Sequence, residues 1–242
     1  MNSPILSALG ITHAVGSGSN RFTVLRDITL EIYSSEVLLL MGPSGSGKTT
    51  LLHILGCLLK PTAGAVTVAG ESTQSLNEEQ LTALRLRQFG LVFQAYNLFP
   101  VLTATENVMV ALDLLGVAKS AARDRAHELL TLVGLGHRLD GYPLQLSSGE
   151  KQRVAIARAL AGDPPILMAD EPTAALDAEA GLKAMKLFHM LAHRLQRAVV
   201  IVTHDPRIVH LADRVMWLED GQIVLSPRPH PEVSSLGVGA AL

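Results

Sequence analysis

The chain has few of the features that mark secreted, membrane-spanning or nucleic-acid-binding proteins. Its single cysteine, Cys57, allows no disulfide within one chain and lies among leucines, where we expect a buried structural thiol. With 20 basic and 22 acidic residues the net charge is −2, so no global positive field favours nucleic acid as a partner. No apolar run approaches the ~18 residues that cross a bilayer, and residues 1–9 lack the basic region of a secretory signal. We therefore expect a cytosolic protein that reaches a membrane only through a partner.

The apolar residues follow the pattern of an α/β protein. The 242 residues, 48% of them hydrophobic, are enough for one large domain or two small lobes, and no internal repeat is visible. Short apolar runs at residues 37–41, 165–169 and 198–202 have the character of buried strands in a parallel sheet. Alternating and β-branched residues at 8–15 and 22–32 predict antiparallel strands at its edge.

Helical spacing interrupts this pattern in the middle of the chain. Apolar residues recur at helical intervals across residues 103–135, and a further helix opens at residues 146–150. We predict a helical insertion at about residues 95–161 within a domain of residues 1–226, followed by a flexible, proline-containing tail of residues 227–242.

A glycine-rich segment follows the first of the apolar runs. Its spacing, Gly-x-x-x-x-Gly-Lys-Thr, between a strand and a helix predicts a phosphate-binding loop, whereas a glycine-rich turn without a nucleotide is the alternative. The backbone N–H groups can surround an anion, to which the helix dipole adds positive potential. Lys48 can reach the β- and γ-phosphates, and the Thr49 hydroxyl can ligate Mg²⁺. The predicted nucleotide contacts are Gly42, Pro43, Ser44, Gly45, Ser46, Gly47, Lys48, Thr49 and Thr50.

Two carboxylates, Asp170 and Glu171, follow the apolar run at 165–169. In isolation, acidic residues that cap a strand before Pro172 would be the simplest explanation. Beside a phosphate loop, Asp170 can hold Mg²⁺ directly or through water, and Glu171 can polarise the water that attacks the γ-phosphorus.

Polar residues also close two other predicted strands. His204 follows the run at 198–202, and Gln94 ends a short strand predicted at residues 90–94. A lone histidine in such a place is usually only solvated or hydrogen-bonded. Adjacent strands would instead bring His204 to the γ-phosphate, and would let Gln94 reach Mg²⁺ or the attacking water.

The segment Ser147-Ser148-Gly149-Glu150 has a local explanation and a functional one. Ser147 and Glu150 have the spacing of a capping box, in which each side chain accepts a hydrogen bond from the other residue's backbone. A helix start with two hydroxyls is also an anion site. Because the chain already has one phosphate loop, this second site is best explained if it serves a nucleotide held by another copy.

In this order the motifs resemble those of the ATP-binding subunit of ABC transporters, over about residues 5–225. The matching positions are 42–49 (Walker A), Gln94 (Q-loop), 146–150 (signature), 166–170 (Walker B), Glu171, 174–177 (D-loop) and His204 (switch histidine). Further local similarity is to the group of lipoprotein-release and macrolide-export ATPases, closest to Dev-type exporters linked to heterocyst glycolipids. The segments that carry it are 55–58, 94–98, 135–139 and 170–177.

The resemblance implies a P-loop NTPase with a RecA-like core, an antiparallel β subdomain and an inserted α-helical subdomain. It implies an ATPase that uses ATP and Mg²⁺ in a head-to-tail dimer, where Ser147, Ser148 and Gly149 of one copy close on the ATP held by Lys48 of the other, and Asp177 lies at the interface. The other implied partners are a separate exporter-type permease, at the cytoplasmic face of the inner membrane, and through it a periplasmic adaptor.

Three positions depart from the family pattern. Ser148 replaces the commonest glycine, and Glu150 stands where many members have glutamine. The aromatic residue that stacks on adenine is matched by His13, with Phe22 as a less favoured substitute.

The run at residues 96–102 is unusually apolar for a connection and is our candidate for the permease-docking surface. A different class of function is a soluble ABC ATPase that acts in translation or DNA maintenance. Such proteins usually join two modules or insert coiled coils or zinc motifs, none of which this chain shows. A non-hydrolysing regulatory binder is disfavoured by Glu171 and His204.

Overall fold

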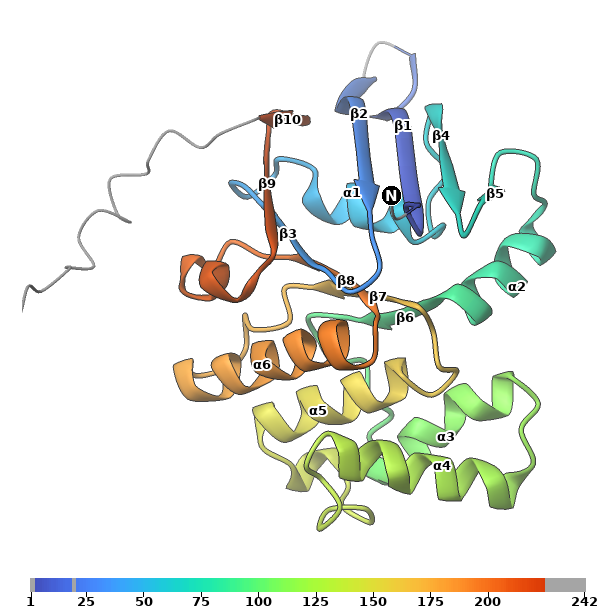
Figure 1. Ribbon diagram of the computed structural model, residues 1–242, viewed down its shortest axis with the longest axis vertical. Coiled ribbons are helices and arrows are strands. Elements are labelled where there is room, and N and C mark those ends of the chain that lie inside the picture. Colours follow the sequence, from blue (N-terminus) through green and yellow to red (C-terminus); the bar gives the residue numbers. More distant parts are fainter. Residues whose placement is uncertain (1–2, 19–20, 225–242) are drawn as a thin grey trace, which may run out of the picture.

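A six-stranded sheet runs through the middle of the molecule, which the computed structural model describes over residues 3–18 and 21–224 (Figure 1). Its strand order is β10-β9-β3-β8-β7-β6. All pairs are parallel except β9 with β10. The strands are β3 (Val37–Met41), β6 (Phe89–Val92), β7 (Ile166–Asp170), β8 (Ala198–Val202), β9 (Arg214–Glu219) and β10 (Gln222–Val224). The three apolar runs thus form adjacent strands, as predicted.

A smaller antiparallel sheet, ordered β2-β1-β4-β5, forms a separate layer (Figure 1). The two strands predicted at the start of the chain are β1 (Leu6–Val15) and β2 (Phe22–Ile32), which pair antiparallel. β4 (Ala63–Val68) and β5 (Glu71–Ser72) extend the sheet. Helix α1 (Lys48–Leu55) lies between the two sheets.

The remaining helices cover the opposite face of the large sheet, apart from α2 (Glu78–Gln88), which leads into β6. In Figure 1, α5 and α6 lie under the sheet, and α3 and α4 lie beyond α5. The predicted helical insertion therefore contains three α-helices. The bounds are α3 (Ala104–Leu114), α4 (Lys119–Leu132), α5 (Ser148–Ala159) and α6 (Ala178–Arg194), with 3₁₀ turns η2 (Pro143–Gln145) and η3 (Pro206–Leu211).

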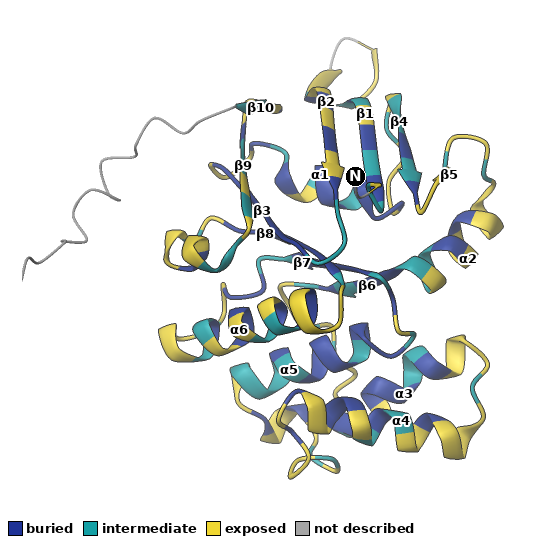
Figure 2. Ribbon diagram, viewed as in Figure 1, coloured by how far each residue is buried: buried dark blue, intermediate teal, exposed yellow. Residues whose placement is uncertain are grey.

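The central strands separate two hydrophobic cores. Side chains alternate along a strand, so Leu38 and Leu40 pack toward α1 and the small sheet. Leu39 and Met41 pack toward the helices of the other face. In Figure 2 the central strands are therefore buried along their length.

Some elements differ from the sequence-based expectation. The strand predicted at 90–94 begins at Phe89 and ends at Val92, so Gln94 lies outside it. Helix α2 and strands β9 and β10 were not predicted. The tail predicted at 227–242 lies outside the described residues. Over residues 3–18 and 21–224, no helix combines the length and the apolar character required to cross a bilayer.

Candidate functional site

The carboxyl ends of four parallel strands meet at one edge of the large sheet. Leu40 on β3 and Asp170 on β7 both pair with Val202 on β8. Val92 on β6 pairs with Ala169. Ligands of open parallel sheets bind outside such carboxyl ends. The residues that follow the strands at this edge are Gly42, Gln94, Glu171 and His204.

The phosphate loop connects β3 to α1 and depends on glycine at two positions. Gly42 has φ of 148°, and a Cβ there would overlap the carbonyl oxygen of Leu218. Gly47, the N-cap of α1, has φ of 100°, and a Cβ there would lie 2.8 Å from Cδ2 of Leu25. Both positions combine left-handed backbone with a close neighbour, so only glycine fits without strain.

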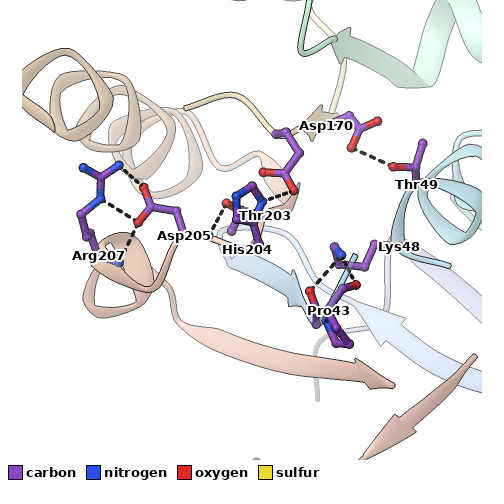
Figure 3. A network of polar contacts seen from close by, with 10 residues as sticks. Pro43, Lys48, Thr49, Asp170, Thr203, His204, Asp205 and Arg207 are labelled. Atoms are coloured by element: carbon purple, nitrogen blue, oxygen red, sulfur yellow. Dashed lines mark hydrogen bonds and ion pairs between the residues drawn. The ribbon is translucent and has the colours of Figure 1, made fainter. Parts of the chain in front are cut away.

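Lys48 begins α1 and folds back over the loop (Figure 3). Its Nζ donates to the carbonyls of Gly42 (2.9 Å) and Pro43 (2.8 Å), and the residue is only 8% exposed. Burial lowers the pKa of Lys48, while the carboxylates of Glu171 and Asp170 act in the opposite sense. An ammonium group is thus held where the loop would surround a phosphate.

Thr49 joins the phosphate loop to β7. Its Oγ1 donates to Oδ1 of Asp170 at 3.2 Å (Figure 3). Burial raises the pKa of Asp170, and the hydrogen bond from Thr49 opposes this. A hydroxyl and a carboxylate are the hard oxygen donors that suit Mg²⁺, which uses one or two protein ligands together with phosphate and water oxygens. The described residues contain no cluster of three or more His, Cys, Asp or Glu that could hold a metal.

Glu171 and His204, predicted to face the same phosphate, are in direct contact. Oε1 of Glu171 lies 2.7 Å from Nδ1 of His204. When the carboxylate is ionised it can only accept, and the imidazole nitrogen is then the donor. Glu171 has φ of 46°, and its backbone N–H donates to the carbonyl of Val202 (2.9 Å). This backbone conformation directs the carboxylate of Glu171 toward His204. The side chain of Glu171 is 15% exposed and that of His204 is 69% exposed.

The start of α5 is the predicted capping box. Ser147 N–H donates to Oε2 of Glu150 (2.8 Å), and Glu150 N–H donates to Oγ of Ser147 (3.2 Å). The hydrogen bond from the Ser147 backbone is the main cause that lowers the pKa of Glu150. Ser147 and Ser148 are exposed. Across the described part of the chain, no hydrogen bond joins this helix start to the phosphate loop.

The amino-acid sequence is similar to those of a known protein family. The family model described as ABC transporter matches residues 25–174. The chain belongs to the ABC transporter family. It is similar to the macrolide export ATP-binding/permease protein MacB of Hahella chejuensis, with 42% identity over 93% of this chain and 34% of the relative. The similarity to MacB of Salmonella choleraesuis is 42% over 98% of this chain and 37% of the relative. The chain thus spans about a third of the length of these relatives.

Solved structures of ABC cassettes share the fold. The dimeric post-hydrolysis state of the ATP-binding cassette MJ0796, bound to ADP and Pi, has a TM-score of 0.83 and 40% identity, and the match covers 90% of this chain and 96% of that one. CbiO1 of Clostridium perfringens has a TM-score of 0.83 and 29% identity, with 93% and 88% covered. The predicted P-loop NTPase fold is confirmed, and this chain is an ABC ATPase domain.

The start of α6, where the resemblance predicts the D-loop, lies against the start of α5, where it predicts the signature. Asp177 is the N-cap of α6, and its Oδ1 accepts from Ala180 N–H at 2.8 Å. A Cβ on Gly149 would lie 3.2 Å from the Cβ of Ala180. Gly149 and Ala180 are therefore neighbours in the fold.

The side chains of His13 and Gln94 form no hydrogen bond within the described residues. His13 is half-buried on β1 opposite Leu25, the residue that limits space at Gly47, and its Nδ1 is buried without a partner among the described residues. Phe22 is 62% exposed. Gln94 is exposed beyond the end of β6. The structure thus places His13 on the strand pair beside the phosphate loop.

Sequence reasoning missed the residues that hold the loop after His204. Asp205 Oδ2 accepts from Nη2 of Arg207 (2.7 Å), and Asp205 N–H donates to Oγ1 of Thr203 (3.0 Å) (Figure 3). The hydrogen bond from Arg207 is the main cause that lowers the pKa of Asp205. An Asp followed by Pro-Arg after a buried strand was the available signal, since Asp favours such N-caps.

Proposed function

We propose that the chain hydrolyses Mg·ATP in a head-to-tail dimer and powers a separate exporter-type membrane permease. The observation that carries the proposal is the contact of Glu171 with His204 at the sheet edge that also holds Lys48. The relatives named for export favour transport over a role in translation or DNA maintenance.

Each residue has a distinct task in hydrolysis. Lys48 offsets the charge of the β- and γ-phosphates, because its ammonium is held over the loop by two carbonyls. Thr49 and Asp170 would hold Mg²⁺, which when bound neutralises charge on the phosphate oxygens. Glu171 orients the attacking water and accepts its proton. His204 holds the Glu171 carboxylate in place, and Gln94 contacts the water or the Mg²⁺ shell.

A second copy completes the site. Ser147, Ser148 and Gly149 present a helix N-terminus that, within the described residues, forms no hydrogen bond with the chain's own phosphate loop. A helix N-terminus with exposed hydroxyls favours an anion. We assign it to the γ-phosphate of ATP bound by the second copy, with Asp177 beside it at the interface. The dimeric state of MJ0796 supports this assembly.

The permease would dock at the apolar run after Gln94. Phe99 is 47% exposed and Val101 78%, while Tyr96, Leu98 and Leu102 are half-buried. Phe99 borders a groove of about 390 Å³ between α2, α3 and the end of α5. Exposed apolar side chains that gather beside a groove favour a partner site. The relatives' printed names join ATP binding to a permease, which supports a permease partner. We extend the proposal to a place at the cytoplasmic face of the inner membrane and, through the permease, to a periplasmic adaptor.

Docking is tested with Phe99→Ala. The side chain is exposed and lines a groove that contains neither Glu171 nor His204, so ATPase activity of the isolated chain should stay nearly intact while permease binding and transport fall. Val15→Ala, on an exposed strand end, is a matched control that should bind the permease as the parent does. Normal permease binding by Phe99→Ala, or joint loss of fold and ATPase activity, would place Phe99 outside the docking surface.

The hydrolytic dimer is tested with Glu171→Gln. The amide keeps the shape of the side chain but removes the proton acceptor, so the variant should bind ATP, hydrolyse it very slowly and elute as a dimer with Mg·ATP. Glu179→Gln, at an exposed ion pair on α6, is the control and should hydrolyse ATP like the parent. A Glu171→Gln protein that binds ATP yet hydrolyses it at the parental rate contradicts the assignment.

A further inference from the structure

The backbone that follows Gln94 is held by the helical insertion. Arg158 on α5 donates from Nη1 to the carbonyl of Asn97 (2.5 Å) and from Nη2 to that of Tyr96 (2.7 Å). Tyr96 and Asn97 have φ of 60° and 50°, a left-handed conformation that residues other than glycine rarely adopt. One guanidinium group therefore fixes an unusual turn that begins two residues after Gln94.

A second side chain of the insertion holds the next part of the segment. Asn107 on α3 is fully buried and donates to the carbonyls of Phe99 (3.1 Å), Leu102 (3.0 Å) and Thr103 (2.9 Å). It also accepts from Phe99 N–H at 2.8 Å. The segment after Gln94 is thus bonded to two different helices of the insertion.

The charge of Arg158 is compensated by these carbonyls. In the described ranges no carboxylate forms an ion pair with the guanidinium. Burial lowers its pKa. A partly buried cation needs hydrogen-bond acceptors, and the planar guanidinium can hold two of them at once. The link between α5 and the turn is therefore stronger than an ordinary surface contact.

Arg158 also lies at the end of α5 that is pressed against the sheet. A Cβ on Gly90 of β6 would overlap the carbonyl oxygen of Ala159, the next residue of the helix. The other end of α5 begins directly after Ser147. At 1.5 Å per residue, the two ends are about 16 Å apart, so a tilt of about 4° about the packed end moves the signature by about 1 Å.

We propose that Arg158 is a positioning residue that converts the position of the Gln94 segment into the tilt of α5. The signature at the far end of the helix is thereby placed for the nucleotide of the second copy, so the inference rests on the proposed dimer. When Gln94 turns toward Mg·ATP, the carbonyls of Tyr96 and Asn97 move with it. The guanidinium, bonded to both, passes this displacement to the helix.

Hydrogen exchange of the full chain tests the link, at protein concentrations where the chain is monomeric. The probes are the amides of Glu150 and Lys151, whose hydrogen bonds to Ser147 report on the helix start. Mg·ATP should change their exchange by about tenfold in the parent, the scale of one hydrogen bond to a charged group. Arg158→Gln should abolish the change, and Arg158→Lys should retain part of it.

A surface arginine provides the matched control. Arg87 is exposed on α2, and among the described residues its guanidinium hydrogen-bonds only to the carbonyl of Ala83 in the same helix (3.3 Å). Arg87→Gln should respond to Mg·ATP like the parent.

Three results would overturn the proposal. The first is that Mg·ATP changes amide exchange in Arg158→Gln as much as in the parent. The second is that Mg·ATP does not change exchange in the parent. The third applies if Arg158→Gln does not fold, and is that Arg158→Lys responds as fully as the parent. Failure of the proposed function looks different. The parent would then bind ATP without hydrolysing it, whereas the exchange measurement requires only binding.

Discussion

One added methyl group at Gly90 would test how closely α5 is held against the sheet. A Cβ there would lie 2.7 Å from Cδ2 of Leu167 and closer still to the carbonyl oxygen of Ala159. Carbon atoms in contact are ordinarily about 3.5–4.0 Å apart, so β6 and α5 would have to separate by roughly 1 Å. The backbone of Gly90 is not left-handed, and the effect is therefore purely one of space.

The size of the effect follows from which atoms must move. Overpacking in a core destabilises by about 1–3 kcal/mol. Because the nearest atom belongs to a helix backbone and cannot rotate away, we expect the upper part of this range for Gly90→Ala. For a domain of this length, about 2–4 °C of melting temperature corresponds to each kcal/mol, so the variant should melt about 5–10 °C below the parent.

Differential scanning calorimetry of Gly90→Ala and Gly181→Ala provides the test. Gly181, on α6, has room for a Cβ, whose nearest neighbour would be the Cβ of Thr173 at 3.6 Å. Alanine is favoured over glycine in a helix by up to about 1 kcal/mol, so this control should melt at or above the parental temperature. If both variants have the melting temperature of the parent, α5 is held less tightly than the contacts of Gly90 indicate.

Three further predictions concern nucleotide binding. At about 4 Å and an effective dielectric constant of about 20, two unit charges interact by about 4 kcal/mol, so Lys48→Ala should weaken ATP binding about 1000-fold. A titration that finds less than a tenfold change in ATP affinity would contradict the role of Lys48. His13→Tyr should increase stacking area and sharpen the preference for ATP over GTP, and unchanged affinities for both nucleotides would show that His13 does not stack on the base. Burial raises the pKa of Asp170, and the protonated carboxyl cannot ligate a cation. The apparent Mg²⁺ affinity should therefore fall when the pH is lowered, and this fall should begin at a higher pH than it would for an aspartate with an ordinary pKa. Mg²⁺ titrations across pH should lose this dependence in Asp170→Asn.

Local sequence patterns predicted the centre of the fold well and its edges less well. The apolar runs of β3 and β8 could be identified because both faces of these strands are buried. Helix α2 was missed because it is polar and buries only Leu81 and Leu84, although the reciprocal capping of Asn77 and Gln80 was a readable signal. The strand predicted to reach Gln94 ends earlier because its pairing with β7 stops at Val92.

The residues of the candidate site could likewise be predicted from local sequence patterns, whereas their contacts could not. Both Glu171 and His204 could be selected from their places after buried strands, but their hydrogen bond depends on strand order and register, which local patterns do not determine. Arg158 and the carbonyl of Tyr96 are 62 positions apart in the chain. No periodicity or motif predicts that a long side chain will reach two backbone acceptors at such a separation.

The pairing of β9 with β3 has an optical consequence. Trp217 is the chain's single tryptophan, and it pairs with Met41, the residue immediately before Gly42. The indole is half-buried against the core, and the next carbonyl, that of Leu218, occupies the space that Gly42 leaves open. A shift of the loop backbone on loading a triphosphate would change the polarity around the chain's one indole. We therefore expect the emission of Trp217 to report nucleotide occupancy without a label.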